Sequence, residues 1–145
     1  MSETTQTPPA KSPPETILVM EPDVLVRMVI ADYLRECGYK VFEGASADDV
    51  LTILNTEIGI DMVFSGAAPQ NGDDGGFSLA HRIRLSHPGI EIVLTSGIEN
   101  ASHKAAKVCG DGPRGLLTKP YNPQEVVRRI QLLRERHRTS NNPWN

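Results

Sequence analysis

Side chains that could share one chemical task follow three of the apolar segments in this chain. Glu21 and Asp23 follow the first such segment, Ser96 closes a later one, and Lys119 ends the last. A carboxylate can accept a phosphoryl group and form an acyl phosphate, and Mg²⁺ prefers carboxylate and phosphate oxygens in octahedral geometry. A lysine can balance the phosphoryl charge, and a hydroxyl can donate a hydrogen bond to one of its oxygens. These residue types point to phosphoryl transfer at a carboxylate.

Apolar runs alternate with amphipathic segments, and together they would position these side chains. The apolar runs predict buried parallel strands at residues 16–20, 39–44, 60–65, 90–96 and 115–119. Helical spacing of the apolar residues predicts helices at 23–38, 46–57, 76–87, 99–108 and 122–138. Five strand–helix repeats predict an α/β fold, with a doubly wound five-stranded parallel sheet, helices on both faces and right-handed crossovers. In such sheets the working site lies beyond the carboxyl ends of the strands.

Local signals mark where several of these helices begin and end. Asp23 is a predicted N-cap of the first helix, and Gly38 is a predicted stop after it. Ser46, with Asp49 three residues later, forms an acidic variant of the capping box. Asn122 is the predicted cap of the last helix, since a proline follows it at the first helical position.

The fourth predicted helix is the weakest of the five. Its segment is rich in alanine, and Ala101, Ala105 and Ala106 would bury little apolar surface. A helix with few apolar contacts is weakly held, so we expect this one to be mobile or to dock a partner.

The length of 145 residues allows one domain with a real core. Residues 1–15 hold four prolines and little to bury, so we expect a disordered tail there. The domain is predicted at 16–138, followed by a flexible tail at 139–145. No output domain is expected after the last helix, which predicts a stand-alone module.

The composition limits which kinds of partner and which cellular compartment are expected for this protein. A net charge of −3 argues against nucleic acid as a partner. No run approaches the roughly 18 apolar residues of a membrane span, and the polar, proline-rich N-terminus does not look like a signal peptide, so a cytoplasmic protein is expected. Cys37 and Cys109 show no disulfide or metal-ligand spacing, which predicts two reduced thiols.

Four phrases of the sequence, taken in order, resemble the receiver domain of bacterial two-component response regulators, the CheY-like family. They read ILVMEPDVLVRMVIADYL, ECGYKVFEGASADDVLTIL, VLTSG and LLTKPYNPQEVVRRI. The resemblance covers residues 16–138 and implies a flavodoxin-like (βα)5 fold with strand order 2-1-3-4-5. It also implies a signalling role in a two-component or phosphorelay pathway, rather than an enzyme.

The resemblance assigns roles to the polar strand ends. Glu21 matches the first member of the family's acidic pair, but Pro22 stands where the second, which helps to bind Mg²⁺, is normally an acid. Asp23 follows one position late. Ser96 matches the switch hydroxyl, and Lys119 matches the phosphate-sensing lysine.

The phosphoacceptor aspartate of the family is missing from its expected place. Aligning from the third strand puts Gly66 there, and aligning from the third helix puts Ala68 there, while residues 62–72 contain no Asp or Glu at all. A glycine cannot form an acyl phosphate, and one remaining carboxylate is a poor Mg²⁺ site. We therefore expect a degenerate receiver with no metal site, no cofactor and weak or absent Mg²⁺ binding. Asp73 and Asp74 are either solvated turn residues or candidate alternative acceptors.

Two signalling functions lead the hypotheses from the sequence. A hydrolase at the same sheet edge is a third, although Glu21-Pro22-Asp23 offers Glu-x-Asp where phosphatases of similar topology need Asp-x-Asp. The first is a signalling module that acts by protein–protein contact without aspartyl phosphorylation. Its partner would be a histidine kinase or another regulator, bound on the face of the fourth helix, fifth strand and last helix, which could also form a homodimer. The alternative is a phosphotransfer receiver that uses Asp73 or Asp74 as a displaced acceptor.

Overall fold

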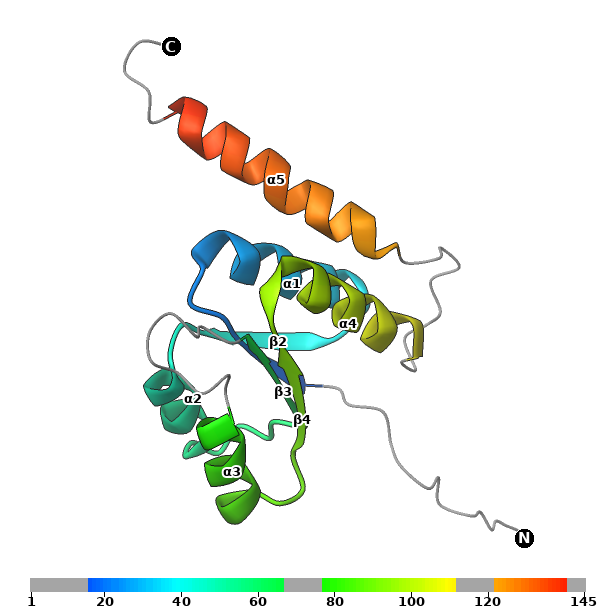
Figure 1. The fold of residues 1–145 in the computed structure, drawn as a ribbon. Helices are drawn as coiled ribbons and strands as arrows, with labels where there is room; N and C mark the ends of the chain where they lie inside the picture. Colours follow the sequence, from blue (N-terminus) through cyan, green and yellow to red (C-terminus); the bar gives the residue numbers. More distant parts are fainter. Residues whose placement is uncertain (1–15, 67–76, 112–121, 141–145) are drawn as a thin grey trace, which may run out of the picture.

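A four-stranded parallel sheet lies at the centre of the computed structural model, which describes residues 16–66, 77–111 and 122–140 (Figure 1). Its strands are β1 (Thr16–Met20), β2 (Lys40–Gly44), β3 (Met62–Gly66) and β4 (Glu91–Thr95), in the order β2-β1-β3-β4. This agrees with the predicted order of the first four strands. The fifth predicted strand, at 115–119, lies outside the described residues, so the five-stranded sheet is not confirmed.

Helices cover both faces of this sheet. They are α1 (Val24–Glu36), α2 (Ala47–Leu54), α3 (Phe77–Ser86), α4 (Gly97–Asp111) and α5 (Pro123–Ser140). Figure 1 shows α1 and α4 on one face and α2 and α3 on the other, with α5 lying outside α1 and α4 as a further layer. No helix within these described ranges is long and apolar enough to cross a membrane.

Alternation along the strands divides the core into two clusters. Ile17 and Val19 of β1 face α1, α4 and α5, whereas Leu18 and Met20 face α2 and α3. Successive side chains of a strand point to opposite faces, so a strand covered on both sides must be apolar throughout. This explains the continuous apolar runs in the sequence.

α4 lies on the α1 face of the sheet, whereas the predicted strand order and right-handed crossovers would put it with α3. The crossover from β3 to β4 carries α3 on the α2 face, and a further right-handed crossover in the same direction would put α4 on that face too. Instead, α4 packs beside α1. Ala101 and Ala105 join the α1 cluster, because their small side chains let the two helices approach closely.

α4 is more deeply packed than its alanine-rich sequence suggests, while its expected mobility or docking of a partner stays a prediction. Ala101, Ala105 and Ala106 are all buried, and α4 is longer than the predicted helix. Sequence reasoning counted the small area of each alanine. It did not anticipate that α4 would pack against both α1 and α5.

The prediction of two reduced thiols is also wrong. Cys37, the C-cap of α1, and Cys109, near the end of α4, form a disulfide with a Cα–Cα distance of 5.6 Å. The chain turns away from α1 at Gly38, whose φ of 100° favours glycine, as predicted. The two cysteines are 72 residues apart, so only the packing of α4 on α1 brings them together.

The predicted caps are confirmed. The Asp23 side chain accepts hydrogen bonds from two backbone N–H groups in the first turn of α1. Ser46 accepts one from the Asp49 N–H, while the Asp49 carboxylate accepts from the Ala45 N–H at 2.8 Å rather than from Ser46. Asn122 accepts a hydrogen bond in the first turn of α5. These local bonds satisfy N–H groups that a helix start leaves unpaired.

Candidate functional site

The carboxyl ends of three strands bring the predicted site residues to one edge of the sheet. Met20 pairs with Ser65 in the register of β1 and β3, and Gly66 pairs with Thr95 in that of β3 and β4. Glu21 and Ser96 each follow directly after these strands. The edge therefore carries Glu21, Gly66 and Ser96, in agreement with the expectation from parallel strands.

Glu21 and Gly66 are in direct contact at this edge. A Cβ atom built on Gly66 would stand 2.2 Å from Glu21 Oε1 and 3.1 Å from Glu21 Cδ. Real Cβ atoms do not approach other atoms this closely. The Glu21 carboxylate thus occupies the space that any side chain at position 66 would enter.

Three hydrogen bonds hold the segment around Glu21. Its Oε2 accepts from the Asp23 N–H at 2.9 Å, and its own N–H donates to the Gly44 carbonyl at 3.0 Å. The guanidinium of Arg27 donates to the Glu21 carbonyl at 2.9 Å. The carboxylate is therefore fixed at one oxygen, while the other points at Gly66.

The surroundings of Glu21 change its acidity. Burial raises the pKa of the Glu21 carboxyl above its ordinary value of 4.5, because the charged form loses hydration. The Asp23 N–H opposes this rise, the Asp23 carboxylate adds to it, and the charges of Arg27 and Arg134 lower the pKa. The net direction is upward, so Glu21 keeps its proton to a higher pH than a solvated glutamate.

Asp23 is committed to structure at both oxygens. Its Oδ1 accepts from the N–H groups of Leu25 and Val26 at 3.0 and 3.2 Å, which caps α1. Its Oδ2 forms an ion pair with Arg134 of α5. Asp23 therefore ties the edge of the sheet to a helix that lies 111 residues further along the chain.

The described residues do not fit the Mg²⁺ site that the resemblance implies. Mg²⁺ needs near-octahedral oxygen ligands. Pro22 and Gly66 offer no side-chain oxygen, both oxygens of Asp23 are engaged, and Glu21 is held by a backbone N–H. Among the described ranges, no three His, Cys, Asp or Glu side chains lie close enough together to hold a metal ion.

The hydroxyl residues at the end of β4 lie on opposite sides of the strand. Thr95 is buried and donates from Oγ1 to the Ser65 carbonyl at 3.3 Å. Ser96 is exposed, and its backbone N–H donates to Oδ1 of Asn100 in the first turn of α4. Ser65 is buried, and its Oγ has no hydrogen-bond partner among the described residues. Of these three hydroxyl residues, Thr95 and Ser65 are buried and Ser96 is exposed.

Several predicted site residues fall in segments without a described structure. Lys119, Asp73 and Asp74 all lie outside the described residues. Their assignments as phosphate-sensing lysine and as alternative acceptors stay predictions.

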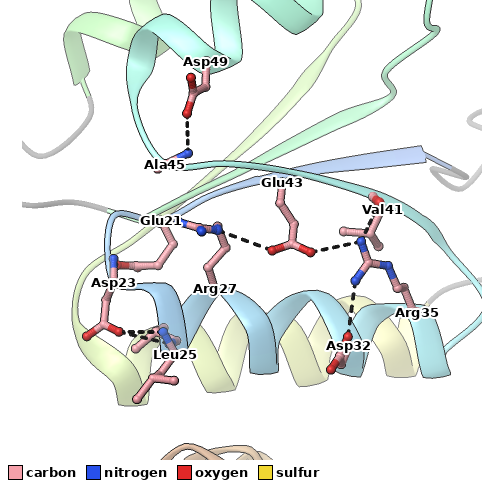
Figure 2. A network of polar contacts seen from close by, with 11 residues as sticks. Glu21, Asp23, Leu25, Arg27, Asp32, Arg35, Val41, Glu43, Ala45 and Asp49 are labelled. Atoms are coloured by element: carbon pink, nitrogen blue, oxygen red, sulfur yellow. Dashed lines mark hydrogen bonds and ion pairs between the residues drawn. The ribbon is translucent and has the colours of Figure 1, made fainter.

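A network of charged side chains beside the edge was missed by sequence reasoning (Figure 2). Glu43 of β2 accepts from Arg27 at 3.4 Å and from Arg35 at 3.1 Å. Arg35 also pairs with Asp32 and donates to the Val41 carbonyl. The available signal was the eight-residue spacing of the two arginines, which puts them on one face of α1. The network links α1 to β2 and holds Arg27 against the Glu21 backbone.

Comparison with known proteins shows where this arrangement belongs. The family model for the response regulator receiver domain matches residues 17–131. The sensor kinase CckA of Brucella abortus (strain 2308) is 29% identical over 123 residues, which cover 83% of this chain and 13% of CckA. The transcriptional regulatory protein PhoP of Escherichia coli (strain K12) is 26% identical over 121 residues, covering 83% of this chain and 52% of PhoP. The chain thus spans about half or less of these relatives.

Solved structures show the same fold. The signal receiver domain of an HD domain-containing protein from Pseudomonas fluorescens Pf-5 has a TM-score of 0.52 and 20% identity, covering 89% of this chain and 99% of its own. A CheY-like receiver domain protein from Methanospirillum hungatei JF-1 has a TM-score of 0.51 and 18% identity, covering 88% and 98%. The family match over most of the chain, the parallel sheet and the strand-end site agree with one another. The chain belongs to the response regulator receiver domain family.

Proposed function

We propose that this receiver acts in two-component or phosphorelay signalling by protein contact and is not phosphorylated on aspartate. One observation carries the proposal: Glu21 Oε1 stands 2.2 Å from the place where a side chain at Gly66 would begin. The position expected for the acceptor lacks a carboxylate and is filled by a neighbour. The expectation that the module acts without an attached output domain stays a prediction.

The chemistry at this edge supports the proposal. Formation of an acyl phosphate needs a carboxylate that can attack phosphorus and a cation that balances the phosphoryl charge. Gly66 has no side chain, and Glu21 is half-buried with a raised pKa and one oxygen already hydrogen-bonded. Receiver domains are signalling modules rather than enzymes in general, and we assign this chain no catalytic residue.

A protein is the expected partner, either a histidine kinase or another regulator. Of the predicted contact face, α4 and α5 are described, and they pack on each other, so α4 presents only its outer side. A groove between α1 and α5 carries apolar side chains and charged side chains of both signs. It is lined by Val29, Asp32, Glu36, Arg129, Leu132, Leu133 and Arg136. We place the partner contact on the α5 side of the molecule, where Leu132 is exposed.

The test is phosphorylation with a small phosphodonor. The protein is incubated with acetyl phosphate and Mg²⁺, and its intact mass is measured beside a receiver domain that carries an aspartate at the end of its third strand. We expect the control to gain one phosphoryl group and this chain to stay unchanged. A stable gain that is lost in Asp73→Asn or Asp74→Asn would refute the proposal and establish the displaced acceptor instead.

A further inference from the structure

We propose that the Cys37–Cys109 disulfide is a reversible redox tether that controls how firmly α4 is held on α1. The bond joins the C-cap of α1 to the last part of α4. The disulfide thus links two helices that are far apart in the sequence. The inference rests on this packing alone and does not require the proposed function to be correct.

Small buried side chains, with the partly buried Ile98 and Val108, make the other contacts between α4 and the α1 cluster. Ala101 and Ala105 fill the interface with one methyl group each. Ser102 is buried, but its hydroxyl donates to the Ile98 carbonyl within the same helix. Because alanine buries little apolar area, the non-covalent contacts contribute less here than the leucine-type contacts of a usual helix interface. The disulfide adds a covalent link to these contacts near the end of α4.

Two polar contacts add to this interface without replacing the bond. The Tyr39 hydroxyl donates to the Val108 carbonyl at 3.2 Å, next to the disulfide. The Lys104 ammonium donates to the Leu94 carbonyl of β4 at 2.6 Å, near the middle of α4. They fix the direction of α4, so the helix can return to the same place after the tether has opened.

The reduced form also fits this site. Both cysteines are 1% exposed, and a free cysteine behaves as a small buried apolar residue. Cys109 Sγ lies 4.0 Å from the Tyr33 carbonyl oxygen. A disulfide sulfur has no hydrogen to donate, but a Cys109 thiol could donate a weak hydrogen bond to that carbonyl. The fold therefore accommodates both oxidation states, which a reversible tether requires.

The reaction is thiol–disulfide exchange with a dithiol reductant. One thiolate of the reductant attacks a protein sulfur, the protein S–S bond breaks, and the other cysteine leaves as a thiolate that takes up a proton. The second thiol of the reductant then attacks the mixed disulfide, which releases the second protein thiol and closes the reductant's own disulfide. Two electrons and two protons pass to the protein. Since both sulfurs are buried, the attack requires the end of α4 to open first.

The tether acts on the same helix that begins at the candidate site. Asn100, in the first turn of α4, accepts from the Ser96 N–H at 3.0 Å. Cys109 lies about 14 Å further along the helix, at about 1.5 Å per residue. Loosening the far end of α4 thus weakens the support of the Ser96 backbone. Reduction of the cysteine pair would therefore loosen the backbone around Ser96 at the carboxyl edge of the sheet.

Hydrogen exchange of the full chain tests the inference. The protein is oxidised with glutathione disulfide or reduced with dithiothreitol, and backbone exchange is followed by mass spectrometry. We expect amides of α4 to exchange about tenfold or more faster after reduction, because local opening becomes easier, while α2 changes less than about twofold. Cys37→Ala/Cys109→Ala should match the reduced protein under both conditions.

Each other outcome overturns the inference. Two alkylatable thiols after acid quenching of the oxidised, folded protein would show that the bond does not form. Equal protection of α4 in both states would show that the bond does not hold the helix. Faster exchange of α2 and α4 alike would make the disulfide a staple of the whole fold. Failure of the reduced protein to re-form the bond in glutathione disulfide would show that the tether is not reversible.

Discussion

The carboxylate of Glu21 lies in the space that a side chain at Gly66 would enter, with Oε1 only 2.2 Å from the place of a Cβ. The two residues are 45 positions apart in the sequence. Glu21 follows β1, and Gly66 ends the neighbouring strand β3. The Glu21 carboxylate can therefore lie where it does only because position 66 has no side chain. A residue larger than glycine at position 66 would require Glu21 to move.

Replacing Gly66 tests this relationship. Alanine is normally favoured over glycine in a strand by roughly 0.5–1 kcal/mol. In Gly66→Ala we expect that gain to vanish, because the Glu21 carboxylate must rotate away and loses its bond to the Asp23 N–H. In the Glu21→Ala background the same change should stabilise. Urea unfolding of the four proteins gives the coupling energy, expected to be about 0.5–1 kcal/mol; additive effects would contradict the contact.

The raised pKa of Glu21 predicts a pH dependence of stability. The folded state binds this proton more tightly than the unfolded state, whose value is near 4.5. The contribution of Glu21 to the free energy of unfolding is therefore fully present below pH 4.5 and is lost as the pH rises through the folded pKa. Glu21→Gln cannot titrate. Urea unfolding from about pH 4 to about pH 8 should show the free energy of unfolding of Glu21→Gln rising relative to that of the wild type as the pH rises. A difference that stays constant with pH would count against the raised pKa of Glu21.

The two roles of Asp23 can be separated by substitution. Asp23→Asn keeps an N-cap acceptor and loses the charge that pairs with Arg134. Both side chains of the pair are more than a third exposed, so we expect a loss of only about 0–1 kcal/mol in the free energy of unfolding. Asp23→Ala loses the cap as well and should cost about 1 kcal/mol more. Arg134→Ala is the matched control and should resemble Asp23→Asn, whereas a cost equal to that of Asp23→Ala would show that the ion pair dominates.

The close packing of α4 on α1 predicts that position 105 tolerates no larger side chain. Ala105 is fully buried in the α1 cluster. Ala105→Leu should therefore lower the free energy of unfolding by about 1–3 kcal/mol through overpacking. His103→Leu, at an exposed position of the same helix, is the matched control and should change stability by less than about 0.5 kcal/mol. If Ala105→Leu and His103→Leu both changed the free energy of unfolding by equally small amounts, Ala105 would not be packed against α1.

Short-range features of this protein could be predicted from its sequence. Asp23, Ser46 and Asn122 begin their helices because a side-chain oxygen reaches N–H groups only two or three residues away. The apolar runs identified the first four strands because their side chains are covered on both faces of the sheet. The strand order and the shared edge of Glu21, Gly66 and Ser96 followed from the rules of parallel sheets and from family resemblance.

Long-range packing decided the rest. A list of residues shows that Gly66 is not an acid, but only the tertiary structure shows that Glu21 fills the space in front of it. The pairing of Cys37 with Cys109 depends on which face of the sheet α4 occupies. The sequence does not show that face, so it predicted two separate thiols. The choice of face is made by the sum of many small contacts between α1, α4 and α5. Caps and strand periodicity depend on neighbours in the chain, so the sequence by itself determined them, whereas the disulfide and the filled acceptor position depend on neighbours in space.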